Sequence, residues 1–87
     1  DFAVLVDESI RAGAVADAIR GAHPTRVRDV SFQSVYRGQG VPEGQKSMAW
    51  SVTFLDEDTT LNDDDVRALE AAVWEALSTE VGGTPRA

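Results

Sequence analysis

A glycine-rich loop between two segments of alternating apolar residues limits what this chain can fold into more than any other feature. The apolar residues lie mainly at even positions on both sides: Val30, Phe32 and Tyr36 before the loop, and Met48, Trp50, Val52 and Phe54 after it. A period of two is typical of strands that bury one face. Glycine and proline between the segments favour turns. The sequence therefore predicts two antiparallel strands, residues 27–36 and 47–55, joined as a long β-hairpin.

Three further elements are predicted around the hairpin. Apolar residues nearly fill residues 2–7, which indicates a strand covered on at least one side. Residues 11–22 repeat apolar side chains at helical spacing, and the pattern ends before a proline. Asn62 precedes three aspartates and a second helical pattern, which predicts a capped helix from there to about Glu80. Two glycines at 82–83 end this helix.

Both helices are expected to pack on the same face of the sheet. The expected core gathers the apolar residues of that face and of the helices: Val4, Val6, Phe32, Trp50, Val52, Phe54, Val15, Ile19, Val66, Leu69 and Val73. The opposite, open face is expected to carry mostly small or hydroxylated residues: Ala3, Leu5, Ala49, Ser51 and Thr53. Sheets that stack RNA bases across this face use aromatic residues, so stacking over the sheet is poorly supported.

The length of 87 residues predicts a single domain over residues 1–87, with room for one core. No apolar run approaches the roughly 18 residues that cross a bilayer, and the first residues lack the layout of a signal peptide. The absence of cysteine excludes disulfides and thiolate metal sites, and suits a reducing cytoplasm. Because the chain starts at Asp1 directly in a strand, we expect it to be excised from a longer protein to which its function belongs.

The net charge of −7 argues against a general nucleic-acid binder, because such proteins displace counterions with basic patches. The charges are unevenly distributed, however. Residues 20–46 hold five cations and two acids, whereas residues 56–87 hold nine acids and two arginines. One end is therefore expected to accept phosphates and the other to repel them.

Three patterns that suggest chemistry are better explained as structure. Gly-Gln-Lys-Ser at residues 44–47 is similar in sequence to a phosphate loop, but glutamine interrupts the motif and the predicted element that follows is a strand. The acidic clusters at 56–58 and 63–65 lack the combination of a central glycine and a twelfth-position glutamate that marks a calcium loop, and fit a turn and a helix start. His23 has no serine, cysteine or acid placed to form a relay. Neither catalysis nor a metal site is expected within this chain.

Five segments follow one another at a specific spacing. They are the opening strand at 2–8, Tyr-Arg-Gly at 36–38, Pro-Glu-Gly-Gln-Lys-Ser at 42–47, Thr-Leu-Asn-Asp-Asp-Asp-Val at 60–66, and Gly-Gly-Thr-Pro-Arg at 82–86. This order resembles the ferredoxin-fold anticodon-binding domain, which closes the β subunit of bacterial phenylalanyl-tRNA synthetase. The chain departs from that family at two places, because Gln33 and Ser34 replace Phe-Asp, and Pro85 replaces a leucine.

The resemblance implies a sixth element, a short strand at residues 84–86, and hence the order β-α-β-β-α-β. The expected fold class is α+β, a ferredoxin-like two-layer sandwich with an antiparallel sheet and two helices on one face. The resemblance also implies a function, because the family binds the anticodon stem-loop of tRNA(Phe) and positions it for aminoacylation with phenylalanine.

The RNA contacts implied by the resemblance lie in the hairpin and at two supporting arginines: Tyr36, Arg37, Lys46, Ser47, Arg28 and Arg86. The implied partners are tRNA(Phe), the rest of the β subunit and the α subunit, in the cytoplasm and without a membrane. The domain itself would need no cofactor, whereas its parent, a phenylalanine–tRNA ligase, would use ATP and magnesium at a distant site.

The alternative is a non-catalytic, ferredoxin-like protein-interaction or small-molecule regulatory module that uses the open face. Such a module would not depend on Arg37 or Lys46. RNA binding through a few cations weakens as salt rises, whereas a dimer interface would be nearly indifferent to salt.

Overall fold

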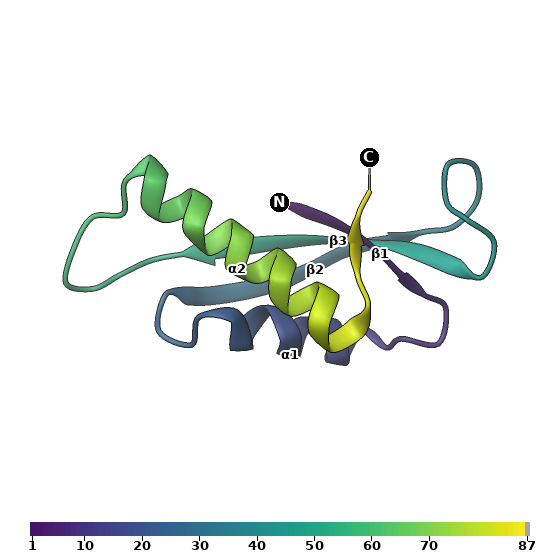
Figure 1. Cartoon of the computed structure of the whole chain (residues 1–87), viewed down its shortest axis with the longest axis horizontal. Coiled ribbons are helices and arrows are strands. Elements are labelled where there is room, and N and C mark those ends of the chain that lie inside the picture. The colour runs from purple at the N-terminus through teal and green to yellow at the C-terminus, as the bar shows by residue number, and fades with distance from the viewer. Residues whose placement is uncertain (87) are drawn as a thin grey trace.

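A computed structural model describes residues 1–86, and Ala87, which the expected domain range includes, lies outside the described residues. Six elements follow in the predicted order (Figure 1): β1 (Phe2–Asp7), α1 (Ala12–Ala22), β2 (Val27–Tyr36), β3 (Gln45–Phe54), α2 (Asp63–Val81) and β4 (Thr84–Pro85). The strands form one antiparallel sheet in the order β2-β3-β1-β4. The predicted ferredoxin-like α+β fold is confirmed.

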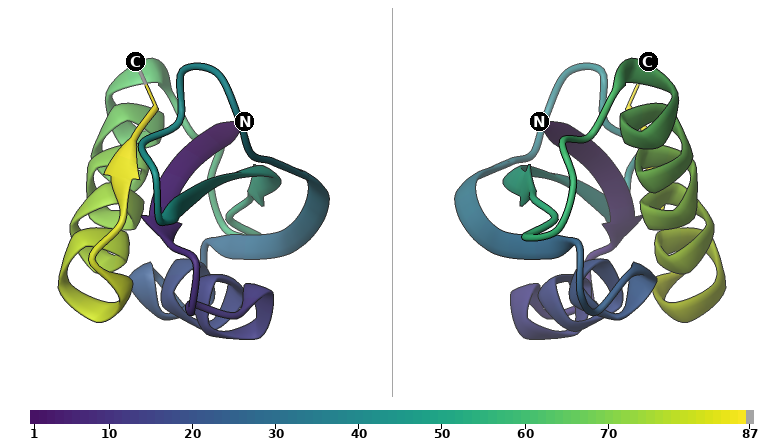
Figure 2. Two further views of the ribbon diagram at one scale, coloured as in Figure 1. Left: turned by 90° about the vertical axis from the view of Figure 1, so that its right-hand side faces the viewer. Right: turned by 90° about the vertical axis from the view of Figure 1, so that its left-hand side faces the viewer.

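Both helices lie against one side of the twisted sheet, and within residues 1–86 no helix covers the other side (Figure 2). Alternation in β1 explains this division, because Val4 and Val6 are buried while Ala3 and Leu5 are only partly covered. The buried core combines residues of the sheet and of both helices: Phe2, Val4, Val6, Val15, Ala16, Ala18, Ile19, Val27, Met48, Trp50, Val73 and Leu77. The split between a covered face and an open face follows directly from the period-two pattern.

The start and end of α2 are those predicted from the sequence. The Asn62 side chain accepts a hydrogen bond from the Asp65 N–H at 2.8 Å, and the Asp65 carboxylate accepts one from the Asn62 N–H at 3.1 Å. This reciprocal capping box satisfies amides that the first turn leaves unpaired. At the other end Gly82 has φ 64°, a left-handed conformation that ends helices and suits glycine.

The strand boundaries differ slightly from the predicted ones. β3 starts at Gln45, two residues before the predicted start, because its ladder with β1 continues through the pairs Val6 with Lys46 and Asp7 with Gln45. β4 is only two residues long. Pro85 is accommodated because β4 is an edge strand, where one missing N–H leaves the ladder intact.

Phe32 is the main error in the predicted core. It pairs with Trp50, and their ring centroids are 5.3 Å apart, yet Phe32 remains 47% exposed. β2 is an edge strand of 10 residues, about 33 Å long, whereas the 11 residues of α1 span only about 16 Å. The helix is therefore too short to cover the whole strand. Val66 is likewise only partly buried, at the exposed start of α2.

Gly83 occupies a position where a β-carbon has no room. A Cβ there would lie 2.7 Å from Cγ2 of Val4 and 3.4 Å from the Leu77 carbonyl oxygen. Val4 and Leu77 are fully buried, so neither can move aside easily. We predict that Gly83→Ala lowers the free energy of unfolding by about 1–3 kcal/mol, as measured by chemical denaturation.

Gly13→Ala is the matched control for this substitution. Nothing lies within 4 Å of a Cβ at Gly13, which is in α1, and alanine favours helices over glycine. The control should keep or raise the stability. Equal stability of the two variants would show that the contact at Gly83 is not tight.

Candidate nucleic-acid interface

The loop of residues 37–44, which joins β2 to β3, has a defined shape at one end of a molecule 44 Å long (Figure 1). The Tyr36 hydroxyl donates to the Gln39 carbonyl at 3.1 Å, and the Val41 N–H donates to the Gly38 carbonyl at 3.0 Å. Three loop glycines have positive φ angles, which other residues rarely adopt. The loop therefore fixes the surroundings of Tyr36.

The strand register brings Tyr36 and Ser47 side by side on the open face. Tyr36 pairs with Ser47, and Ser47 pairs with Leu5. Residues directly opposite each other across antiparallel strands point to the same side, and Leu5 points away from the buried Val4 and Val6. Tyr36 is 42% exposed, whereas Ser47 is only 4% exposed. Tyr36 is therefore available to a ligand, while Ser47 lies beneath its neighbours.

Arg86 reaches the same place from the opposite edge of the sheet. Its N–H donates to the Ala3 carbonyl at 3.0 Å, and its guanidinium carbon lies 4.7 Å from the centroid of the Tyr36 ring. Its Nη2 is also 3.6 Å from the position of a β-carbon at Gly40. A guanidinium over an aromatic face is a favourable contact. Aromatic and arginine side chains together are a common means of binding unstacked bases.

Arg37 is paired with an acid that was not among the predicted site residues. Its Nε lies 2.9 Å from both carboxylate oxygens of Glu8, and its Nη2 also donates to one of them. The hydrogen bonds from Arg37 hold the pKa of Glu8 below its ordinary value, although desolvation partly opposes them. Both side chains remain about half exposed. The sequence could have indicated this contact only through the position of Glu8, which follows the strand that pairs with the start of β3.

Lys46 is buried, with 8% of its surface exposed, and pairs with Val6 on the side of the sheet that faces the helices. Its charge contributes to lowering the pKa of Asp7, after the larger effect of hydrogen bonds from Ser9, and it also acts on the pKa of Glu8. The two cations predicted for this end therefore lie near two carboxylates. The expected cationic edge is locally neutral, and RNA contact by Arg37 and Lys46 stays a prediction.

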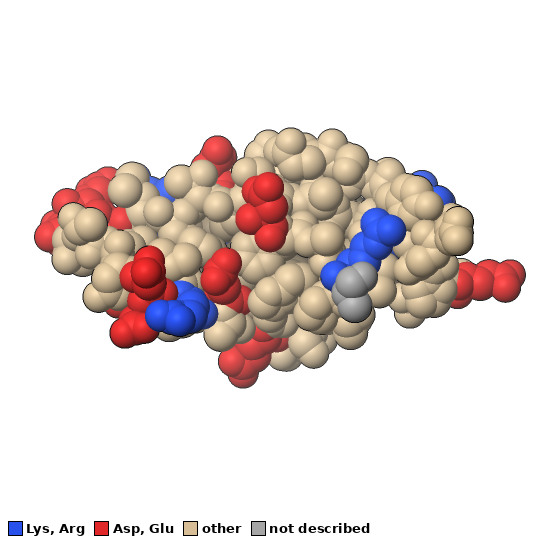
Figure 3. Space-filling model, turned by 90° about the horizontal axis from the view of Figure 1, so that it is seen from above, with Lys and Arg blue, Asp and Glu red and all other residues tan. Residues whose placement is uncertain are grey.

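The acidic side chains gather at the far end of the molecule. In Figure 3 most of the acidic surface lies on the side where Figure 1 places the loop between β3 and α2. The side toward the hairpin is mainly uncharged, with a few basic side chains and one acidic side chain that projects from its end. Like charges repel, and the phosphates of a nucleic acid are negative. An RNA would therefore meet less repulsion at the hairpin end.

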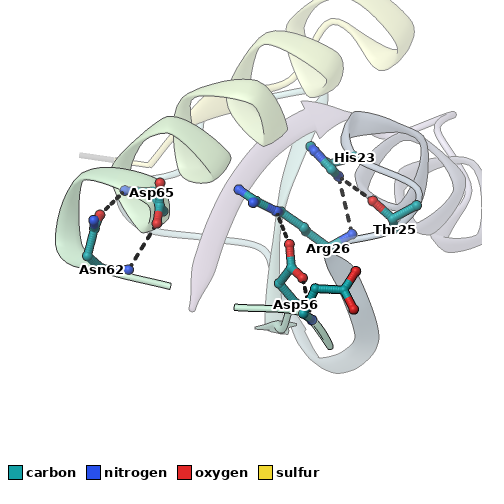
Figure 4. Close-up of polar contacts among 7 residues, drawn as sticks. His23, Thr25, Arg26, Asp56, Asn62 and Asp65 are labelled. Atoms are coloured by element: carbon teal, nitrogen blue, oxygen red, sulfur yellow. Dashed lines mark hydrogen bonds and ion pairs between the residues drawn. The ribbon is translucent and has the colours of Figure 1, made fainter. Parts of the chain in front are cut away.

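Arg28 is not brought to the hairpin end. It lies eight positions before Tyr36 in β2, about 26 Å along the extended strand. Its Nη2 donates to Glu57 at 3.0 Å, and the neighbouring Arg26 donates to Asp56 at 2.8 Å (Figure 4). Acids of the loop after β3 therefore hold both arginines, and RNA contact by Arg28 stays a prediction.

Other kinds of site find little support in the arrangement. Among residues 1–86, no three histidine, aspartate or glutamate side chains gather in a way that could hold a metal ion. The phosphate-loop-like residues 44–47 enter β3 and not a helix, so their amides do not converge on a phosphate. No helix in the described part of the chain is long and apolar enough to cross a membrane.

Comparison with known proteins gives one consistent result. The family model described as "Ferredoxin-fold anticodon binding domain" matches residues 1–86. The chain is 40% identical over 86 residues to the phenylalanine–tRNA ligase beta subunit of Geobacillus kaustophilus, 41% over 86 residues to that of Chromobacterium violaceum, and 36% over 87 residues to that of Bradyrhizobium diazoefficiens. These alignments cover 99%, 99% and 100% of this chain but only 11% of each relative. The chain thus spans about a tenth of the length of these relatives.

The ion pair between Arg37 and Glu8 makes a prediction for the titration of Glu8. The pKa of the Glu8 carboxyl should lie below its ordinary value of 4.5, and Arg37→Gln should return it toward that value. Because the pKa is lower in the folded state, the pair adds stability above the ordinary pKa, and this stability is lost as the pH falls through the folded pKa. Carboxyl-carbon NMR over the acid range measures both values.

Arg28→Gln serves as the control, since Arg28 lies at the other end of β2 and pairs with Glu57. It should leave the titration of Glu8 unchanged. A Glu8 carboxyl that titrates near 4.5 in the unmodified chain and in both variants would contradict the ion pair.

Proposed function

Since this chain belongs to the ferredoxin-fold anticodon-binding domain family, we propose that it binds the anticodon stem-loop of tRNA(Phe) within the β subunit of a phenylalanine–tRNA ligase. Its contribution is positional. Binding energy gained at the anticodon end orients the tRNA, so that the acceptor end reaches a reaction site elsewhere in the ligase. The chain itself holds and orients RNA and catalyses nothing.

The observation that carries the proposal is the contact between Tyr36 and Arg86 on the open face. An aromatic ring offers a stacking surface to any base, and an adjacent guanidinium attracts the phosphates of the same strand. Tyr36 is 42% exposed although Arg86 lies over its ring, so a base has room to stack. This single ring at the sheet edge replaces the aromatic surface that the centre of the open face lacks.

The local charges favour stacking over phosphate contacts as the source of affinity. Arg37 is held by Glu8 and Lys46 is buried, whereas Arg86 is exposed and lies over the Tyr36 ring. With few phosphates neutralised, the affinity should fall only gently as salt rises. A base-stacking mode also fits a chain with a net charge of −7, since stacking does not require a basic surface.

The rest of the ligase supplies the remaining parts of this proposal. The partners are tRNA(Phe), the remainder of the β subunit and the α subunit, and the setting is the cytoplasm. ATP and magnesium belong to the adenylation of phenylalanine outside this chain, because residues 44–47 lead into a strand and do not form a nucleotide loop. A protein-interaction or small-molecule regulatory module is not favoured, since the family match covers residues 1–86.

Replacing the Tyr36 ring tests the proposal. Tyr36→Leu should weaken binding of a fluorescent tRNA(Phe) anticodon stem-loop about tenfold, because stacking of one base on an aromatic side chain contributes about 1–3 kcal/mol. Tyr36→Phe keeps the ring and loses only the hydrogen bond to Gln39, so it should keep most of the affinity. Fluorescence anisotropy, with the protein in excess over the stem-loop, measures the affinities of the unmodified chain and of both variants.

Phe32→Leu is the matched control, because Phe32 is a comparably exposed aromatic residue on the same strand that faces the other side of the sheet. It should change the affinity less than twofold. The proposal fails if Tyr36→Leu and Phe32→Leu have the same effect on the affinity for the stem-loop, or if an RNA duplex without a loop binds the unmodified chain equally well.

A further inference from the structure

Glu8 lies where the hairpin end would otherwise present a free cation. Its carboxylate accepts hydrogen bonds from Nε and Nη2 of Arg37, which is the two-point geometry that a phosphate also adopts with arginine. With 55% of the Arg37 side chain and 47% of the Glu8 side chain exposed, the pair is open to solvent. The carboxylate therefore occupies the side of the guanidinium that an RNA phosphate would use.

The backbone keeps Glu8 in this position. The Glu8 N–H donates to the Gly44 carbonyl at 2.9 Å, which ties the residue after β1 to the end of the hairpin loop. The preceding Asp7 carboxylate accepts a hydrogen bond from the Ser9 N–H at 2.9 Å. Both acids are thus fixed beside the loop, and the pKa of each is lowered, so both stay ionised at neutral pH.

An approaching polyanion meets a neutral surface here. Its phosphate must either displace Glu8 from Arg37 or bind next to a carboxylate that repels it. Displacement is possible because an exposed ion pair adds little stability. The contact with Arg37 therefore gives little net attraction, and binding depends on contacts made elsewhere on the open face.

We propose that Glu8 determines specificity by suppressing the binding of RNA that can contact only Arg37. It acts as an internal competitor for phosphate and leaves selection to the contacts at Tyr36 and Arg86. This inference rests on the proposed RNA-binding function. It adds a residue that acts by opposing the wrong ligand, a common way of obtaining specificity.

A positioning role for Glu8 gives the opposite expectation. If Glu8 only held Arg37 in place to receive a phosphate, its loss would weaken RNA binding. The competitor role requires that its loss strengthens binding to any polyanion. The sign of the change therefore separates the two roles.

The test compares Glu8→Gln with the unmodified chain on two probes. One is the duplex poly(A)·poly(U), which offers phosphates but no unstacked bases, and the other is the tRNA(Phe) anticodon stem-loop. At low salt, Glu8→Gln should bind the duplex roughly fivefold more tightly, and the slope of log affinity against log salt should steepen by about 0.9, as for one added phosphate contact on a double helix. The ratio of stem-loop to duplex affinity should fall. Adding Arg37→Gln to Glu8→Gln should abolish the gain.

Glu43→Gln is the matched control, because Glu43 is an exposed acid of the loop of residues 37–44, which also contains Arg37. It removes the same charge without releasing Arg37, and should improve duplex binding less than twofold. Equal gains in both variants, or duplex binding by Glu8→Gln that is no tighter than that of the unmodified chain or stays undetectable, would overturn the inference. An unmodified chain that does not prefer the stem-loop to the duplex would instead count against the proposed function, and the duplex comparison would still decide the role of Glu8.

Discussion

The antiparallel pairing of β1 with β3 is the constraint on which the rest of the structure depends. It places Val4 beside Met48 toward the helices and Leu5 beside Ser47 toward the open face. A slip of one residue would exchange the two faces of a strand and expose the core. The same pairing carries the end of β1 to the hairpin, where the Glu8 N–H meets the Gly44 carbonyl. The core, the open face and the acids beside the loop therefore follow from a single register.

The arrangement of charges at the hairpin end reconciles the acidity of the chain with its proposed role in RNA binding. Arg37 is paired with a carboxylate and Lys46 is buried, so a general attraction for polyanions is weak at the hairpin end. What remains accessible is an aromatic ring with one arginine beside it. Such a surface gains affinity chiefly from an unstacked base, which a stem-loop presents and a regular duplex does not.

Local patterns in the sequence were sufficient for most of the fold. Period-two alternation located β2 and β3, a short apolar run located β1, and Asn62 with its following aspartates marked the start of α2 within one residue. The exposure of Phe32 was not predictable in the same way, because it depends on how far α1 extends along β2. The last strand rested on a resemblance and not on periodicity, yet it forms at the edge position where Pro85 is tolerated.

The candidate site was predicted only in part, because its key contacts join residues far apart in the chain. Arg37 and Glu8 are 29 residues apart, and Arg86 meets Tyr36 from the opposite edge of the sheet. A list of cations cannot show which of them an acid will neutralise or the fold will bury.

The most direct test of the central claim is an NMR titration of the isotope-labelled chain with the tRNA(Phe) anticodon stem-loop. If the open face beside the hairpin is the RNA-binding surface, the largest amide shifts should occur at Leu5, Tyr36, Ser47 and Arg86. Signals from α1 and from residues 56–61 should change little. The largest shifts along α1 or in the acidic loop would contradict the account.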